Sequence, residues 1–142
     1  MKNPQTSAER LFSQFQSIKL KSIKDWGCCA FVLMWCLGKD FDDIEAIITL
    51  GKMMDRGVIG ADCTVYWNEA CKYLTGKSLK VEFKEITSLK GIKEKTPVRF
   101  DYKGKSHWVG VENGRIKFNS LEESNCVKNG KPATARILHI GD

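Results

Sequence analysis

The chain has 142 residues, of which 42% are hydrophobic and 28% are charged. This composition predicts a single soluble globular domain over residues 1–142, and it excludes a disordered chain. The net charge of +6 would attract an anionic partner such as nucleic acid, a cell wall or an acidic peptide, but an ordinary solvated basic surface is the more expected interpretation. The sequence has neither an aromatic-rich strand motif nor helix-turn-helix spacing, so nucleic acid is the least expected of these partners.

Residues 1–7 lack the apolar run of a secretory signal, and the longest apolar stretch, residues 30–37, is too short to span a bilayer. We therefore expect a cytoplasmic protein that needs no membrane, with release by phage-type lysis as an open route out of the cell. No pattern in the sequence indicates an oligomeric state.

Helical patterns dominate the first half of the chain. Thr6 and Glu9 have the spacing of a capping box, which predicts a first helix over residues 7–18. Residues 28–37 are uniformly apolar and are followed by Gly38, which is typical of a buried helix with a glycine stop.

Two further helices are expected before the pattern changes. Asp40 has the position of an N-cap for the third, whose apolar face carries Phe41, Ile44, Ile47 and Ile48. The fourth covers residues 65–74, where the apolar residues have helical spacing, and Gly76 ends it. The helical half of the chain therefore covers about residues 1–76.

The second half, about residues 77–142, has the alternation and turn signals of strands. The expected strands cover residues 79–83, 97–102, 107–111, 115–118 and 135–140. Asn113-Gly114 predicts a hairpin between the third and fourth of them. Helices followed by an antiparallel sheet predict an α+β fold.

The cysteines show no metal-binding spacing. The six are Cys28, Cys29, Cys36, Cys63, Cys71 and Cys126. Because no Cys-x-x-Cys pair occurs and the two histidines are remote, the sequence predicts free thiols, no metal site and no cofactor. Core positions are expected for Cys36 and Cys71, which lie in apolar helical patterns, and for Cys29, about 100° around the helix from Cys28.

Cys28 is the candidate nucleophile. It follows Gly27 at a helix start, where unpaired backbone N–H groups favour the thiolate and lower its pKa. His107, at the head of an expected strand, is the candidate general base and is preferred to His139. Asn119 is the candidate that holds the imidazole in its tautomer, and the Cys28 backbone N–H is a candidate oxyanion donor.

The alternative for Cys28 is a buried structural cysteine, and for Asn119 an ordinary turn residue. Trp26 and Trp108 are expected to line a substrate cleft, because indoles near a reactive group offer a large apolar contact surface.

The NlpC-type cell-wall peptidases, a branch of the papain-like superfamily, carry a Cys-Ser-Gly-Phe-Val signature that Cys28-Cys29-Ala30-Phe31-Val32 resembles. The stretch from His107 to Gly114 is similar to their histidine strand, and Asn119 stands where they commonly carry a third polar residue. The bacteriocin-processing double-glycine peptidases share this order. Residues 118–131 resemble an uncharacterised phage- and plasmid-borne branch, and the whole resemblance covers about residues 20–125.

The resemblance implies a nucleophile helix packed on a C-terminal antiparallel sheet, and hydrolysis of an amide bond through a thioacyl-enzyme formed on Cys28. The substrate it implies is a peptide, an isopeptide or a peptidoglycan stem peptide. A catalytically degenerate binding module is the alternative, because no glutamine stands just upstream and the third catalytic residue is unsettled. Gly27 also replaces the family's usual aspartate. The side chains available there are those of Ser22, Lys24, Asp25 and Trp26.

The identity of the third catalytic residue depends on the register of the hairpin. A two-residue turn at Asn113-Gly114 pairs His107 with Ser120 and places Asn119 on the other side with Trp108. A three-residue loop with the glycine in a bulge brings Asn119 opposite His107. The apolar pattern of the hairpin favours the shorter turn, so both Asn119 and Ser120 remain candidates.

Overall fold

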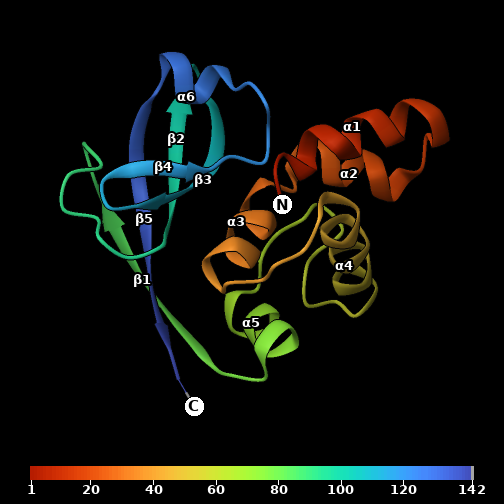
Figure 1. Ribbon diagram of the computed structural model, residues 1–142, viewed down its shortest axis with the longest axis horizontal. Helices are drawn as coiled ribbons and strands as arrows, with labels where there is room; N and C mark the ends of the chain where they lie inside the picture. The colour runs from red at the N-terminus through yellow and green to blue at the C-terminus, as the bar shows by residue number, and fades with distance from the viewer. Residues whose placement is uncertain (142) are drawn as a thin grey trace.

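The computed structural model describes residues 1–141. The helices are α1 (Pro4–Phe15), α2 (Ile18–Trp26), α3 (Cys28–Cys36), α4 (Asp43–Asp55), α5 (Trp67–Thr75) and α6 (Asn125–Asn129). The strands are β1 (Leu79–Glu85), β2 (Thr96–Tyr102), β3 (Lys105–Glu112), β4 (Arg115–Phe118) and β5 (Lys131–Ile140). Five helices precede the strands, and the short α6 lies between β4 and β5 (Figure 1).

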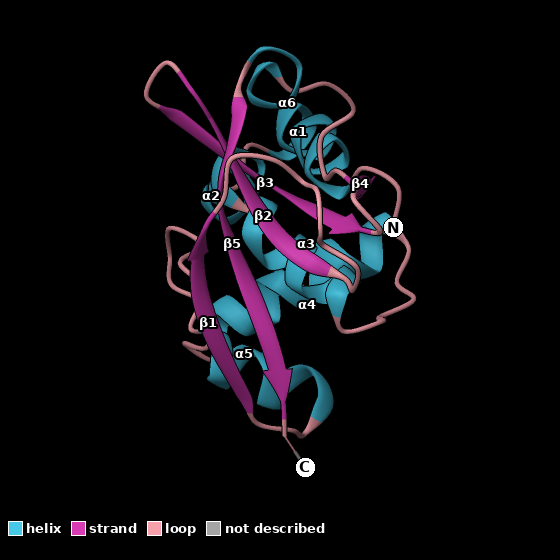
Figure 2. Cartoon of the chain, turned by 90° about the vertical axis from the view of Figure 1, so that its left-hand side faces the viewer, coloured by secondary structure: helices cyan, strands magenta, loops and turns pink. Residues whose placement is uncertain are grey.

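The strands form one antiparallel sheet in the order β1-β5-β2-β3-β4. Helices α1 to α5 lie to one side of it, on the right in Figure 1, and α3 packs on β3 and β2. The short α6 packs on β2 and β3 from the opposite face. Figure 2 shows the long strands running past the helical layer. The expected α+β class is therefore confirmed.

Each face of the sheet has its own core, because alternate residues of a strand point to opposite faces. On the face of α6, the buried strand residues are Val98, Phe100, Val109, Val111 and Ala135. On the face of α3, Gly110 lets the helix approach β3, since a Cβ there would lie 2.5 Å from Cε3 of Trp35. Trp35 also stacks on Phe118, with ring centroids 6.1 Å apart.

The prediction of one helix over residues 7–18 is wrong. Helix α1 begins three residues earlier, where proline suits the first helical position, and Thr6 makes no cap. Gln16 adopts a left-handed backbone (φ 49°) that ends α1, and Ser17 then caps a separate helix, α2, by accepting from the Leu20 N–H. The sequence did not indicate α2 because its lysines interrupt the apolar spacing that is typical of a helix.

Three other boundaries differ in smaller ways. Asp42, not Asp40, caps α4, because Asp42 and Glu45 form a reciprocal capping box. The buried helix α3 and the helix α5 lie within one or two residues of their predicted limits, and Gly38 and Gly76 follow them with positive φ. The short α6, capped by Ser124, was not predicted from the sequence.

The hairpin between β3 and β4 combines features of both registers considered above. Asn113-Gly114 is a two-residue turn with positive φ at both positions, and Val111 pairs with Ile116. The register then shifts, and Gly110 pairs with Phe118. This bulge turns Phe118 to the face of α3, whereas Ile116 packs in the core on the face of α6. The next residue, Asn119, therefore points to the side of β3 that carries His107.

No helix within residues 1–141 is long and apolar enough to cross a membrane.

Candidate active site

Cys28 is the first residue of α3, and only Gly27 separates it from α2. A Cβ on Gly27 would lie 2.5 Å from the Ile23 carbonyl oxygen and 3.0 Å from the Phe31 ring. The tight junction of the two helices therefore explains why glycine stands where the resembling family has aspartate. The Cys28 side chain is almost completely buried, with 8% of its surface exposed.

His107 and Asn119 are joined by a hydrogen bond of 2.7 Å between the imidazole Nε2 and the amide Oδ1. The same oxygen accepts the backbone N–H of Leu121 at 3.1 Å, which fixes it as an acceptor. The Nε2 of His107 must therefore be the donor, and the second ring nitrogen, Nδ1, is left as the basic atom. His107 is 4% exposed, so its tautomer is determined by the hydrogen bond to Asn119 and not by contact with solvent.

The structure brings Cys28 to the histidine strand. Hydrogen bonding from the Trp108 backbone lowers the pKa of the Cys28 thiol, so the sulfur lies beside the residue that directly follows His107. Cys28 and Trp108 also line the same cavity. The thiol at the start of α3 thus lies beside β3, the strand that carries His107.

The expected lowering of the thiol pKa is wrong in direction. Burial raises the pKa of Cys28 more than the backbone N–H groups of Trp108, Cys29 and Cys28 itself lower it. Burial also lowers the pKa of His107, and the hydrogen bond to Asn119 opposes this only in part. Near neutral pH the Cys28 thiol and the His107 imidazole therefore both rest in their neutral forms, because burial disfavours the charged form of each.

The start of α1 holds the segment that carries Asn119. The Asn3 side chain donates to the Asn119 carbonyl at 2.9 Å, and the backbone N–H groups of Gln5 and Thr6 both donate to the Ser120 carbonyl. The buried Ser120 hydroxyl donates to Gln5 Oε1 at 2.8 Å, so Ser120 faces α1 and Asn119 is the residue on the imidazole.

Gln5 extends this contact to α2, the helix that ends shortly before Cys28. Its side chain is 3% exposed, and its Nε2 donates to the Lys24 carbonyl in α2 at 2.7 Å. One glutamine therefore links the end of α2, just before Cys28, to the residue just after Asn119. Sequence reasoning missed this residue, since no local pattern indicates a partner more than a hundred positions away.

The side chains upstream of Cys28 are occupied elsewhere. The Ser22 hydroxyl donates to the Ala61 carbonyl and lies 3.6 Å from Cys63 Sγ. Asp25 accepts from both Lys21 and Lys24, which hold its pKa below the usual range. The backbone N–H at the start of α3 therefore stays the candidate oxyanion donor.

A cavity of about 350 Å³ opens at Cys28. Both predicted tryptophans line it, Trp26 with 55% of its surface exposed and Trp108 half-buried. Trp67 belongs to the same wall and meets Trp108 edge-on, with centroids 6.0 Å apart. Cys29 also lines the cavity rather than lying wholly in the core, and burial raises the pKa of its thiol well above the ordinary value.

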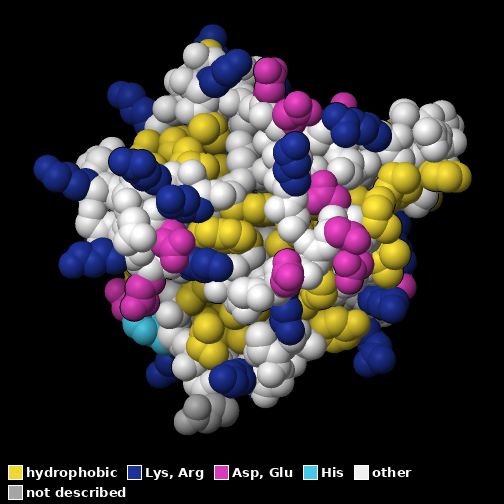
Figure 3. All heavy atoms as spheres, viewed as in Figure 1, with side chains coloured by type: hydrophobic (Ala, Val, Ile, Leu, Met, Phe, Trp, Pro, Cys, Tyr) yellow, Lys and Arg dark blue, Asp and Glu magenta, His cyan; other side chains and the backbone are white. Residues whose placement is uncertain are grey.

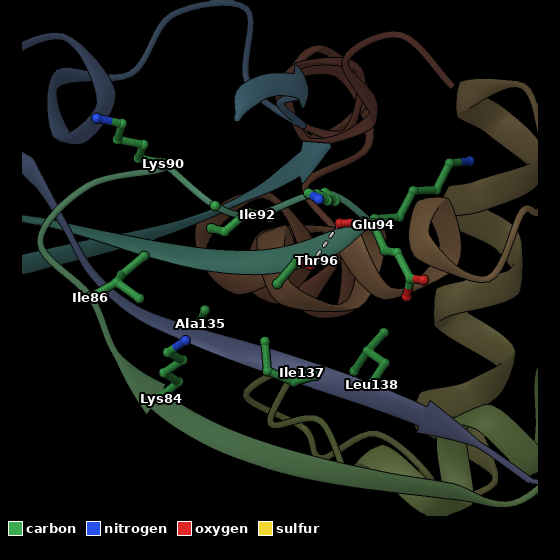
Figure 4. A pocket seen from close by; sticks show the side chains of 12 residues that line it. Lys84, Ile86, Lys90, Ile92, Glu94, Thr96, Ala135, Ile137 and Leu138 are labelled. Atoms are coloured by element: carbon green, nitrogen blue, oxygen red, sulfur yellow. Dashed lines mark hydrogen bonds between the residues drawn. The ribbon is translucent and has the colours of Figure 1, made fainter. Parts of the chain in front are cut away.

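On the face shown in Figure 3, basic side chains are numerous but are interspersed with acidic and apolar ones rather than forming one uniform patch. In α2, Lys19 pairs with Asp55, while Lys21 and Lys24 pair with Asp25. Other lysines surround a second cavity of about 340 Å³ between β5, β2 and the loop over residues 86–95 (Figure 4). Its lining has an apolar floor and neither a thiol nor an imidazole.

His139, the less favoured histidine, is exposed on β5 beside Glu82 and does not line the cavity at Cys28. Within residues 1–141, no group of three or more His, Cys, Asp or Glu side chains is arranged to hold a metal ion.

No protein-family model matches the chain, and neither a curated protein nor a solved structure does. A functional proposal therefore depends on the geometry of the site and on the short motifs that led to it.

Proposed function

We propose that this protein is a papain-like cysteine hydrolase that cleaves an amide bond through a thioacyl-enzyme. The observation that carries the proposal is the buried His107–Asn119 hydrogen bond, 2.7 Å long, on the strand whose next residue, Trp108, hydrogen-bonds the Cys28 thiol through its backbone. A nucleophile, a base and a group that orients the base are the minimum that such chemistry requires.

The mechanism follows from the neutral resting state. As the Cys28 sulfur attacks the substrate carbonyl carbon, His107 Nδ1 accepts the thiol proton. Asn119 holds the resulting imidazolium in place through Nε2. The imidazolium then gives its proton to the departing amine, and the acyl group stays on the sulfur. Water, activated by the same nitrogen, releases the acid and restores the thiol.

The backbone N–H of Cys28 is the proposed donor to the developing oxyanion. Among the available donors it has the advantage that the start of a helix leaves its first N–H groups without intrahelical partners. The three indoles of the cavity give an extended substrate apolar walls close to the sulfur. A peptide, an isopeptide or a peptidoglycan stem peptide fits these requirements.

The test uses p-nitrophenyl acetate, which acetylates a nucleophilic thiol and releases p-nitrophenolate. We expect a rapid burst and a single acetyl group on Cys28, located by peptide mass mapping, and loss of both in Cys28→Ser. Cys36→Ser is the matched control, because Cys36 lies at the far end of the same helix and burial raises its pKa to about 12. Acetylation of several cysteines at similar rates, with no burst, would contradict the proposal.

A binding module that has lost turnover is the second candidate. It is favoured by the neutral thiol and by the lack of a glutamine a few residues upstream of Cys28, where the Ser22 hydroxyl is bonded to the Ala61 carbonyl. This candidate predicts that purified peptidoglycan or peptides bind equally well to the protein and to Cys28→Ala, without cleavage. Cleavage abolished by the same substitution excludes it.

A further inference from the structure

Arg136, on β5, lines the same cavity as Cys28 and has an incompletely satisfied guanidinium group. Its Nη1 is buried and has no hydrogen-bond partner among residues 1–141. The guanidinium is held between two rings, with Cζ 4.7 Å from the centre of Phe83 and 5.1 Å from that of Trp108. Stacking on both rings fixes the plane of the group, so its donors point in set directions.

Arg99, on the neighbouring strand β2, has the carboxylate partner that Arg136 lacks. Two nitrogens of Arg99 donate to the two carboxylate oxygens of Asp101, at 3.0 and 3.1 Å. Arg136 pairs with no carboxylate within residues 1–141. A partly buried guanidinium without a counter-ion is costly to the fold, and such a cost is usual where a ligand supplies the missing charge.

The acidic residues of the cavity do not fill this role. Asp25 is held by Lys21 and Lys24, and Asp62 accepts from the Thr64 N–H and hydroxyl. Arg136 is therefore the cation that the cavity leaves available. It lies close enough to the nucleophile's neighbour for a charge on Cys29 to act on its pKa.

We propose that Arg136 receives a carboxylate of the substrate, which makes an amide with a free carboxylate near the scissile bond the substrate class of this site. The inference rests on the proposed hydrolase function and narrows it. A carboxylate matches the planar fork of the guanidinium with two parallel hydrogen bonds, and an amide or ester does not. The carboxylate comes either from the end of the peptide or from an acidic side chain.

The test compares iodoacetate with iodoacetamide, two alkylating agents of similar size that differ in charge. In both reactions a bond forms between the Cys28 sulfur and the reagent carbon, iodide leaves, and His107 takes the thiol proton. The measured quantity is the rate constant for iodoacetate divided by the rate constant for iodoacetamide at Cys28. The modified residue is identified by peptide mapping and fragmentation. We expect this ratio to fall about tenfold in Arg136→Gln, as is usual when a charge-assisted hydrogen bond is lost.

The control is Arg99→Gln, because the Arg99 guanidinium already has its carboxylate. We expect this variant to keep the wild-type ratio. Arg136→Lys keeps the charge without the fork and should retain part of the preference. An unchanged ratio in Arg136→Gln overturns the inference and leaves the hydrolase proposal standing. Failure of both reagents to modify Cys28 overturns both proposals.

A measurement on the unaltered protein covers the case in which Arg136 variants do not fold. Acetyl-Ala-Ala, its C-terminal amide and acetyl-Glu-Ala-amide are compared as protectants of Cys28 against iodoacetamide. Stronger protection by the first identifies a terminal carboxylate, and by the third an acidic side chain. Equal protection by all three, or by none, overturns the inference.

Discussion

Replacing Asn119 by alanine removes one oxygen that accepts two hydrogen bonds, from His107 Nε2 and from the Leu121 N–H. His107 is buried, so its N–H is left without a partner, and each unsatisfied donor costs about 1–3 kcal/mol. We expect a total loss of about 3 kcal/mol in the free energy of unfolding. With a denaturant slope of about 2 kcal/mol/M, the urea midpoint falls by about 1.5 M.

The same substitution frees the imidazole to change tautomer. Acetylation of Cys28 by p-nitrophenyl acetate should therefore slow about a hundredfold, a usual share for general-base catalysis. Ser120→Ala is the control, because the Ser120 hydroxyl contacts Gln5 and not His107. It should lower stability by about 1 kcal/mol and leave the acetylation rate within about threefold. Equal rates in Asn119→Ala and the wild type would refute the role given to Asn119.

Three further outcomes are expected. Burial raises the pKa of Cys36 to about 12 and of Cys63 to about 11, whereas the unfolded thiols ionise from about pH 9. The unfolding free energy measured in urea should therefore fall above pH 9, and fall less in Cys63→Ala; a flat profile up to pH 11 contradicts this. Gly110→Ala should lower stability by about 1–3 kcal/mol, because its new Cβ meets an indole of α3, whereas Gly51→Ala, which meets only a flexible lysine stem, should not; equal melting temperatures for the two variants would count against this packing. Gln5→Ala should cost about 2 kcal/mol in urea unfolding, since two buried hydrogen bonds are lost, and wild-type stability would show that they are dispensable.

The sequence predicted the features that depend on local pattern. The apolar run at α3, the alternation of the strands and the Asn113-Gly114 turn are each written in consecutive residues, and the structure has them near their expected limits. Helix α2 was missed because four of its nine residues are charged and interrupt the apolar pattern. Lys21 and Lys24 pair with Asp25 of the same helix, whereas Lys19 pairs with Asp55, which is distant in the sequence.

The details of the site depend on long-range packing, which the sequence does not display. The bulge after Ile116 lets Phe118 reach Trp35, and this contact, not the turn, decides that Asn119 points to His107. Ser120 makes two hydrogen bonds to Gln5, one through its backbone carbonyl and one through its hydroxyl, and these join opposite ends of the chain. The direction of the Cys28 pKa shift depends on how deeply the thiol is buried, and this cannot be predicted from its position at the start of a helix.

The central claim, that His107 activates the Cys28 thiol, is tested most directly by chemical rescue. The rate of Cys28 alkylation by iodoacetamide is measured at neutral pH in the wild type and in His107→Ala, with and without added imidazole. The account predicts a rate about a hundredfold lower in the variant and a concentration-dependent recovery as imidazole enters the space left by the side chain. Alkylation of the variant at the wild-type rate, with no response to imidazole, would contradict it.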